Sequence, residues 1–488
     1  MSIFSEMLSE YIREKEIKVF SLVKYCGTDR STMYKIINGK RNPPTPELFQ
    51  KISDFLHLTP VEYQRFEEAW KITLTGHDVY YRRKSVENFI SYFPSPASVS
   101  IPDQPDFHIS EETCRSPQAA STIISRQQLN AHLHHMLLTE SGKKSGKIAL
   151  LLQPDYDFLF GLLSSLKPSG SLKIQHLLCI TGKDTFTDQN YLYNLSCLRK
   201  IFPLYMAGLD YVPRFFYDQI QSHYHNFNMF PCLILTSDQA LMCDPEYKSG
   251  ILYNSLEIVE LLWKEFLSFY DKCSSLFTCA PLFPESPDAY FDILLDTTDQ
   301  DLFIGIQPES CFTPFFTPSL LNEIFNHDIP YGEKILQSAL KSFDNNRRKL
   351  LLGKFILYFT EEGIEYFART GLIEEFPRMF YTPLNPDQRL QLLNAVLSSC
   401  QDGAYRILKH PLGHLPANLR LYIRNGQCCI SFINNEMEIV LLQILESSFF
   451  ATFQDYMENM ETSCYYTEEE SSAIIQRLID RLHTGEWQ

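Results

Sequence analysis

Basic and hydroxyl side chains recur between residues 17 and 42 at spacings that gather several of them on one side of a short helix. Over a helix expected at 29–38, positions three and four apart share a face, and the outer face carries Arg30, Ser31, Tyr34 and Lys35. A guanidinium neutralises phosphate charge and can donate two parallel hydrogen bonds to one pair of acceptors. This pattern predicts recognition of an anionic polymer that presents both phosphates and hydrogen-bonding edges.

Apolar residues on the opposite side predict how this helix is held in place. Met33 and Ile36 lie three residues apart on its inner face. A preceding helix is expected at 18–26, and its Val23 would pack against the helix at 29–38. Gly27, four residues later, supplies the permissive backbone that a tight turn needs. The stretch therefore predicts two short helices joined by a tight turn.

The flanking sequence predicts three more helices. A first is expected at 3–13, a fourth begins near Thr45 after a run of prolines, and a fifth is capped by Thr59. Each carries an apolar stripe at helical spacing. Five helices within residues 1–71 would form a complete small all-α domain.

Residues 17–42, IKVFSLVKYCGTDRSTMYKIINGKRN, resemble the helix-turn-helix of Xre/Cro-type repressors. The resemblance extends over residues 1–71, about one seventh of the chain, and its motif is specific over 19–41. It implies that residues 29–38 enter the major groove of duplex DNA. Because one such domain binds a half-site weakly, it also implies a homodimer.

The resemblance assigns roles by position. Arg30, Ser31 and Lys35 would read bases, and Arg30 suits a bidentate contact to guanine. Contacts to the sugar–phosphate backbone are implied for Thr28, Thr32, Lys40 and Arg41. Tyr34 lies among the outer residues, whereas Asp29 is acidic and is expected to cap the helix rather than to contact DNA.

Charge is unevenly distributed along the 488 residues. The chain has a net charge of -16 at pH 7, which argues against a chain-wide electrostatic grip on nucleic acid. Residues 18–41 nevertheless contain six basic residues and one acidic residue. Basic charge is therefore concentrated where DNA is expected, and the acidic remainder keeps other surfaces away from phosphates.

Targeting and cysteine signals favour a cytoplasmic protein. The start MSIFSEMLSE has neither a basic n-region nor an apolar h-region, and no run of 18 apolar residues predicts a membrane span. The 13 cysteines are scattered, without a C-x-x-C pair, which favours a reducing compartment. The adjacent Cys428 and Cys429 would be a redox sensor or, far more commonly, one inward and one outward residue of a strand.

A stretch rich in proline and serine divides the chain. Residues 72–93 predict a helical connector whose cluster Arg82-Arg83-Lys84 either contacts the DNA backbone or forms a solvated face. Residues 94–121 contain five prolines and few apolar residues, which is the composition of a linker. We therefore predict a DNA-binding domain at 1–71, a connector and linker at 72–121, and two lobes at 122–280 and 281–488.

From residue 122 onward, apolar runs alternate with amphipathic stretches, which predicts an α/β body. The expected elements are a helix at 122–138, a strand at 147–153, a helix at 158–166 and a strand at 172–181. This alternation, with its strands, disfavours an all-helical repeat array.

A hairpin followed by a long helix is expected twice in the body. The first pair is a hairpin at 231–243, which turns at Ser237-Asp238, and a helix at 255–272. The second is a hairpin at 419–433, which turns at Asn425-Gly426, and a helix at 437–457. The repeat indicates two similar lobes, although hairpin-then-helix is also a common unit by itself. A final helix is expected at 467–482.

Two patterns that suggest a cofactor or metal site do not withstand inspection. Residues 142–147, GKKSGK, resemble a phosphate loop, but three residues rather than four separate the glycines and a strand follows, so we predict a basic turn. The histidines gather as His132, His134 and His135, and again as His410 and His414, without a nearby Cys or carboxylate to complete a set. No metal or cofactor is expected.

Acidic residues gather in two places. Asp155 and Asp157 follow a strand, and Asp296, Asp299 and Asp301 form a local patch. Carboxylates at strand ends can serve acid–base or metal chemistry, and they are equally the ordinary residues of turns and helix caps.

Catalytic signatures are missing from the sequence. It contains no G-x-S-x-G nucleophile elbow. A tandem α/β body invites comparison with phospholipase-D-like regulator domains, but their H-x-K motif is absent, so even that fold would be catalytically silent. We do not expect an enzyme.

Together these features predict a sequence-specific DNA-binding transcriptional regulator. Its body would dimerise and sense a small-molecule or peptide effector. The alternative is an enzyme or a peptide-responsive protein that carries a DNA-targeting helix-turn-helix. A peptide-responsive protein built from helical repeats would have no strand content. Circular dichroism of residues 122–488 therefore tests it, because clear strand content would disfavour the helical-repeat alternative.

Overall fold

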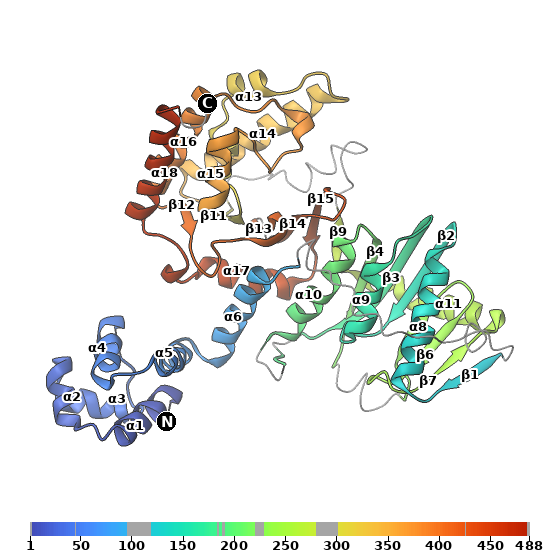
Figure 1. The fold of residues 1–488 in the computed structure, drawn as a ribbon, viewed down its shortest axis with the longest axis horizontal. Coiled ribbons are helices and arrows are strands. Elements are labelled where there is room, and N and C mark those ends of the chain that lie inside the picture. The colour runs from blue at the N-terminus through green and yellow to red at the C-terminus, as the bar shows by residue number, and fades with distance from the viewer. Residues whose placement is uncertain are drawn as a thin grey trace. The chain divides into compact units, whose positions relative to one another are not determined.

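The computed structural model describes residues 2–43, 45–94, 119–182, 185–187, 191–219, 229–279, 301–424 and 426–485. The chain divides into two compact units, the first built on Met1–Ser85 and the second on Val86–Thr187 and Leu192–Gln488 (Figure 1). Within its described residues the first unit is helical, whereas the second combines helices with two mixed sheets. This confirms the predicted fold class, an all-α domain followed by a larger α/β body.

The first unit contains the five expected helices, α1 (Ile3–Glu14), α2 (Val19–Cys26), α3 (Arg30–Ile37), α4 (Pro46–Leu56) and α5 (Pro60–Thr75). As predicted, the Thr45 and Thr59 side chains cap α4 and α5. Aromatic rings form the centre of the core: Phe4 stacks on Phe66 at 4.6 Å between centroids, and Phe49 stacks on Trp70 at 4.4 Å. This apolar core holds α2 and α3 in a fixed arrangement.

Helix α6 (His77–Ser91) follows α5 after Gly76, whose positive φ of 89° ends the preceding helix. Its first half belongs to the first unit and its second half to the second unit. The first domain was expected to end at residue 71, whereas α5 continues to Thr75 and the compact unit to Ser85. Most of the expected linker, residues 95–118, lies outside the described residues.

The second unit, which we call the body, has two lobes. Its first lobe, residues 119–275, contains an eight-stranded sheet in the order β1-β7-β6-β5-β2-β3-β4-β8. Strands β2, β3 and β4 are parallel, and β5, β6 and β7 continue from β2 as an antiparallel meander. The strands are β1 (Ala120–Ile123), β2 (Ser145–Leu151), β3 (Ser171–Ile180), β4 (Asp210–Tyr217), β5 (Cys232–Leu235), β6 (Ala240–Cys243), β7 (Gly250–Tyr253) and β8 (Ser274–Ser275).

The second lobe, residues 301–485, repeats this topology. Its sheet has the order β12-β11-β10-β13-β14-β15-β9, in which β10, β11 and β12 are parallel and β13, β14 and β15 form the meander. Strand β9, although it precedes this lobe in sequence, pairs with β15. The strands are β9 (Phe277–Cys279), β10 (Phe303–Gln307), β11 (Phe355–Thr360), β12 (Tyr405–Leu408), β13 (Arg420–Arg424), β14 (Gln427–Ile433) and β15 (Ile439–Ile444).

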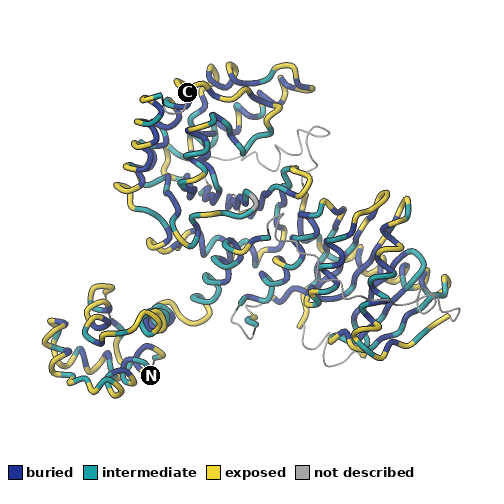
Figure 2. The backbone as a smooth tube through the Cα atoms, in the orientation of Figure 1, coloured by how far each residue is buried: buried dark blue, intermediate teal, exposed yellow. Residues whose placement is uncertain are grey.

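Helices cover both faces of each sheet, so the central strands are mostly buried, whereas edge strands such as β1 and β8 are largely exposed or half-buried (Figure 2). In the first lobe α8 (Arg126–Ser141), α9 (Asp157–Ser165) and α10 (Tyr193–Met206) pack on one face and α11 (Leu256–Tyr270) on the other. In the second lobe α17 (Ser447–Glu458) takes the place of α11. The opposite face is covered by α13 (Pro318–Ile324), α14 (Gly332–Leu351), α15 (Glu361–Thr370), α16 (Pro386–Gln401) and α18 (Glu468–His483).

Several expected elements differ in the structure. Residues 120–123 form strand β1, and the helix expected from 122 begins only at Arg126, after the capping residue Ser125. The helix expected over 437–457 was wrong in its first half, because Ile439–Ile444 pairs with β14 and only Ser447–Glu458 is helical. In the described residues, no helix combines the length and apolarity needed to cross a bilayer.

Candidate nucleic-acid interface

The turn between α2 and α3 has the predicted geometry. Gly27 ends α2 with φ 66°, a left-handed conformation that favours glycine. Asp29 then caps α3, because its carboxylate accepts a hydrogen bond from the backbone N–H of Thr32 at 2.8 Å. Hydrogen bonds from Thr32, first from its side chain, lower the pKa of Asp29. The carboxylate is therefore committed to the helix, as the sequence predicted.

Helix α3 is strictly two-sided. Met33 and Ile36 are fully buried in the core of the first unit. The opposite face is exposed and carries the four outer residues named from the sequence, Arg30, Ser31, Tyr34 and Lys35. The structure thus brings the predicted base readers together on one solvent-facing surface.

The predicted backbone contacts lie at the two ends of α3. Thr28 and Thr32 are half-buried near its start, whereas Lys40 and Arg41 are exposed beyond its end. Gly39 turns the chain with φ 67°, and the backbone N–H groups of Lys40 and Arg41 both donate to the Lys35 carbonyl, at 2.8 and 3.1 Å. Both cations are therefore held beside the last turn of α3.

One exposed feature of the first unit was not anticipated. Helix α2 exposes Phe20 and Tyr25, 73% and 53% accessible, on its outer side. The ring of Tyr25 packs against that of Phe55, with 5.2 Å between their centroids, and Phe20 points away from the core. The helical spacing of α2 would have revealed them, because its inner positions are occupied by Leu22 and Cys26.

The two carboxylates predicted after strand β2, Asp155 and Asp157, have local partners. Asp155 accepts a hydrogen bond from the Tyr193 hydroxyl at 2.8 Å. Asp157 opens α9 and forms a 2.9 Å ion pair with Lys200. Both carboxylates are exposed and serve local structure. In the other patch, Asp296 and Asp299 lie outside the described residues.

A buried ionic cluster in the second lobe was not predicted. Glu309 and Arg420 pair at 3.0 Å, with their side chains only 4% and 2% exposed. The second oxygen of Glu309 accepts from the Glu374 N–H at 2.6 Å. Burial, with the Glu309 carboxylate next, raises the pKa of Glu375 to about 7. No local pattern signals this cluster, because its members come from distant parts of the chain.

The rejected sequence patterns have structural roles. Lys143 pairs with Glu140 at 2.7 Å and with Asp238 at 3.1 Å, so the glycine-flanked segment is a basic turn that leads into β2. His414 lies 2.9 Å from Glu362. Across the described ranges, no three His, Cys, Asp or Glu side chains gather as a metal site would require.

The adjacent cysteines Cys428 and Cys429 face opposite sides of β14, as expected of a strand. Both sides are buried, because one residue belongs to each of the two cores that flank the sheet. The second cysteine is therefore not outward-facing. Every described cysteine is a free thiol.

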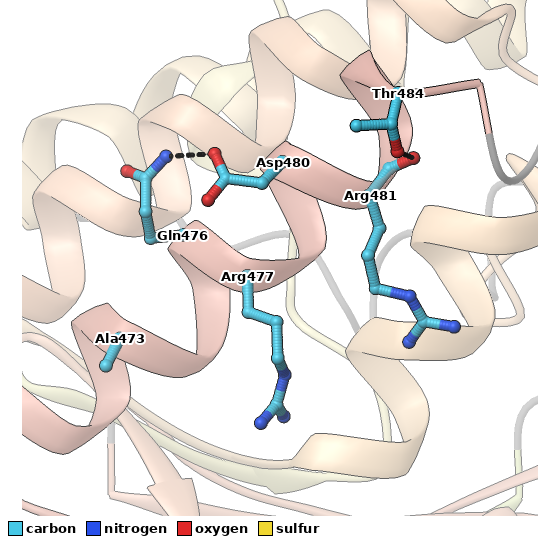
Figure 3. A pocket seen from close by; sticks show the side chains of 6 residues that line it. All are labelled: Ala473, Gln476, Arg477, Asp480, Arg481 and Thr484. Atoms are coloured by element: carbon cyan, nitrogen blue, oxygen red, sulfur yellow. Dashed lines mark hydrogen bonds between the residues drawn. The ribbon is translucent and has the colours of Figure 1, made fainter.

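A shallow hollow of about 430 Å³ runs along α18. It is lined by one face of this helix, Ala473, Gln476, Arg477, Asp480, Arg481 and Thr484 (Figure 3). Arg477 and Arg481 are paired with Glu361 and Glu365 of α15, and Gln476 donates to Asp480 at 2.9 Å. With its charges paired, the hollow does not rival α3 as a binding surface.

Comparison with protein-family models and with curated proteins found no match. Among solved structures, the chain is similar to the archaeal chromatin protein TrmBL2, with 11% identity, a TM-score of 0.21, and coverage of 55% of this chain and 99% of that one. It is also similar to phosphatidylserine synthase of Haemophilus influenzae Rd KW20, with 11% identity, a TM-score of 0.23, and coverage of 75% and 93%. For polyphosphate kinase of Porphyromonas gingivalis the values are 9% identity, a TM-score of 0.22, and coverage of 78% and 59%. These TM-scores are too low to support an inference about function.

Proposed function

We propose that this protein is a sequence-specific DNA-binding transcriptional regulator of the Xre/Cro type. The observation that carries the proposal is the outer face of α3. Arg30, Ser31 and Lys35 are exposed there, while Met33 and Ile36 anchor the same helix in the core. A rigidly held helix that presents cations and hydroxyls is what base readout in the major groove requires.

The ends of α3 extend this proposal to the DNA backbone. Lys40 and Arg41 are exposed and held by hydrogen bonds to the Lys35 carbonyl. Cations placed beside, rather than on, the recognition face suit phosphates, which fix the register of a protein on the duplex. Thr28 and Thr32 are proposed to contact the backbone at the other end.

The test compares full-length variants on DNA selected from a random duplex library. Arg30→Ala and Lys35→Ala are each expected to weaken specific binding by about 1–3 kcal/mol. Arg65→Ala, an exposed cation on α5, is the matched control and should bind as wild type does. Equal affinity of wild type, Arg30→Ala and Lys35→Ala for the selected sequence would exclude this interface.

The phosphate contacts have a separate signature. The double change Lys40→Ala with Arg41→Ala is expected to lower the slope of log affinity against log salt by roughly 2, and to weaken all sequences alike. A changed base preference with an unchanged slope would assign these residues to base readout instead.

We further propose that the body dimerises and binds an effector without chemical turnover. Two recognition helices joined through one dimer gain effective concentration on paired half-sites. Sedimentation of the full chain at tens of micromolar tests the dimer, and a strictly monomeric chain would exclude it. A thermal-shift screen of metabolites tests the effector, and turnover of any compound would make the protein an enzyme.

A further inference from the structure

Arg30 occupies a position that helix stability does not favour. It is the first residue of α3, directly after the capping residue Asp29. The N-terminal end of a helix carries partial positive charge, so a cation there is unfavourable unless something else interacts with it. The cap itself does not, because the Asp29 carboxylate accepts from Thr32.

The side chain that Arg30 does contact is an aromatic ring. Its guanidinium carbon lies 5.5 Å from the centroid of the Tyr34 ring. The two residues are four positions apart, the spacing at which side chains on a helix meet. Tyr34 is itself 39% exposed, so the pair stands on the solvent-facing side of α3.

Other cations of the first unit that lie over rings are bound by acids. Lys15 lies over Tyr11 but pairs with Glu62 at 3.1 Å. Lys84 lies over Tyr80 but pairs with Glu68 at 2.7 Å. Among the described residues, Arg30 has neither an acidic partner nor a hydrogen-bond acceptor for its guanidinium, so its N–H donors are available there.

A guanidinium on a ring keeps its donors available. Stacking uses the face of the planar group, while its five N–H bonds point outward from the edge. The ring also reduces the conformational freedom that a long side chain loses on binding. A guanidinium held in this way is ready for the two parallel hydrogen bonds that guanine accepts at O6 and N7.

We infer that Tyr34 is a positioning residue that holds Arg30 for bidentate readout of one guanine, and so sets the base preference at that position. This inference rests on the proposed function. It assigns to the tyrosine ring a role in specificity rather than a general contribution to affinity. The hydroxyl group is not needed for that role, because the contact with Arg30 is made by the ring.

The test is selection of random duplex DNA by full-length wild type, followed by affinity measurements on the selected sequence and on its guanine-to-adenine variants. Arg30→Ala identifies the guanine that Arg30 reads. At that base pair, Tyr34→Ala and Tyr34→Leu are expected to lower the guanine-over-adenine ratio about 2–5-fold, the value of one exposed cation–π contact. Tyr34→Phe should keep the wild-type ratio.

The outcomes separate this inference from the function on which it rests. If wild type enriches no sequence, the proposed function fails and the inference with it. If Arg30→Ala loses a guanine preference that Tyr34→Ala keeps, DNA reading stands and the positioning role is excluded. A Tyr34→Ala variant that weakens all sequences equally would also exclude it, because a structural defect does not select one base pair.

Discussion

In the first lobe β2 runs into Gln153-Pro154-Asp155, and in the second lobe β10 runs into Gln307-Pro308-Glu309. The two strands occupy the same place in sheets of the same topology. Yet Asp155 is exposed, whereas Glu309 is buried with Arg420. Equivalent strand ends thus lead into an open loop in one lobe and into a buried ion cluster in the other.

The neighbouring strand explains the difference. In the second lobe Tyr422 lies opposite Gly305 and its hydroxyl donates to Gln307 at 3.0 Å. The equivalent residue of the first lobe, opposite Leu151, is Leu233.

Extending these registers by two residues, beyond the last paired positions, puts Arg420 opposite Gln307 and Pro231 opposite Gln153. At these two positions the first lobe therefore has neither the hydroxyl nor the cation, and among the described residues the buried side-chain amide of Gln153 has no hydrogen-bond partner. The comparison teaches that the partner strand, not the shared Gln-Pro-acid sequence, decides whether charge is buried.

The largest expected effect tests the buried pair against the exposed one. Arg420→Met should cost about 3–5 kcal/mol of unfolding free energy, because it leaves the Glu309 charge buried without its partner. In the first lobe, Lys200→Met removes the exposed partner of Asp157 and should cost at most about 1 kcal/mol. Urea unfolding of the full chain measures both, and adding Glu309→Gln to Arg420→Met should recover part of the loss.

The second expected effect is a pH dependence that arises at one buried carboxyl of the second lobe, Glu375. The pKa of Glu375 is about 7 in the folded chain against an ordinary value of 4.5. The groups around its carboxyl are Glu309, Arg420 and the Cys311 thiol. Between pH 4.5 and 7 the folded chain keeps a proton that the unfolded chain has lost. The contribution of Glu375 to stability therefore falls as pH rises through this window, by about 3 kcal/mol. His176 in the first lobe contributes with the opposite sign, because burial lowers its pKa to about 4.

The difference between wild type and Glu375→Gln isolates this term. The variant cannot ionise at that position, so its stability relative to wild type should rise from pH 4.5 to 7.5. Asp155→Asn in the first lobe serves as the control and should follow wild type. Parallel curves for wild type and Glu375→Gln would contradict the buried-carboxyl interpretation.

The comparison also shows which features the sequence predicts. The exposed outer face of α3 was predictable because its determinants are local: the Asp29 cap, the Gly27 turn, and the spacing of Met33 and Ile36 lie within a few residues of one another. The Arg30–Tyr34 contact is local in the same sense, although nothing in the sequence says that Arg30 lacks an acidic partner.

The body was predictable only where its signals are local. Its hairpins carry turn residues, and the first turns as expected at Ser237-Asp238. Strand β10 is buried at every residue and has no alternation to identify it. Residues Ile439–Ile444 are similarly apolar, so their sequence does not separate them from the following helix. The pairing of Glu309 with Arg420 joins residues 111 positions apart, a separation at which the sequence carries no spacing signal.

A smaller effect on the free energy of unfolding is expected at Gln307, the second-lobe counterpart of Gln153. Gln307 donates to the Glu309 carbonyl at 2.9 Å and accepts from Tyr422. Gln307→Leu should therefore destabilise the chain by about 1–3 kcal/mol, because two buried groups lose a partner. Tyr422→Phe removes only one of these bonds and should cost less in the same urea titration.

The smallest effect should have the opposite sign. Gln153 is 4% exposed, and neither its amide nitrogen nor its oxygen has a hydrogen-bond partner in the described part of the chain. Gln153→Leu replaces an unsatisfied buried amide with an apolar side chain of similar size, so it should stabilise the chain by about 1 kcal/mol. Replacing glutamine by leucine would then have opposite effects at the two equivalent strand ends. Gln153→Leu would raise the urea midpoint of the chain, and Gln307→Leu would lower it. A loss of stability in Gln153→Leu would mean that the amide has a hydrogen-bonding partner outside the chain. In that case the side-chain amides of Gln153 and Gln307 would both be hydrogen-bonded, and the two strand ends would differ only in the partner that each amide uses.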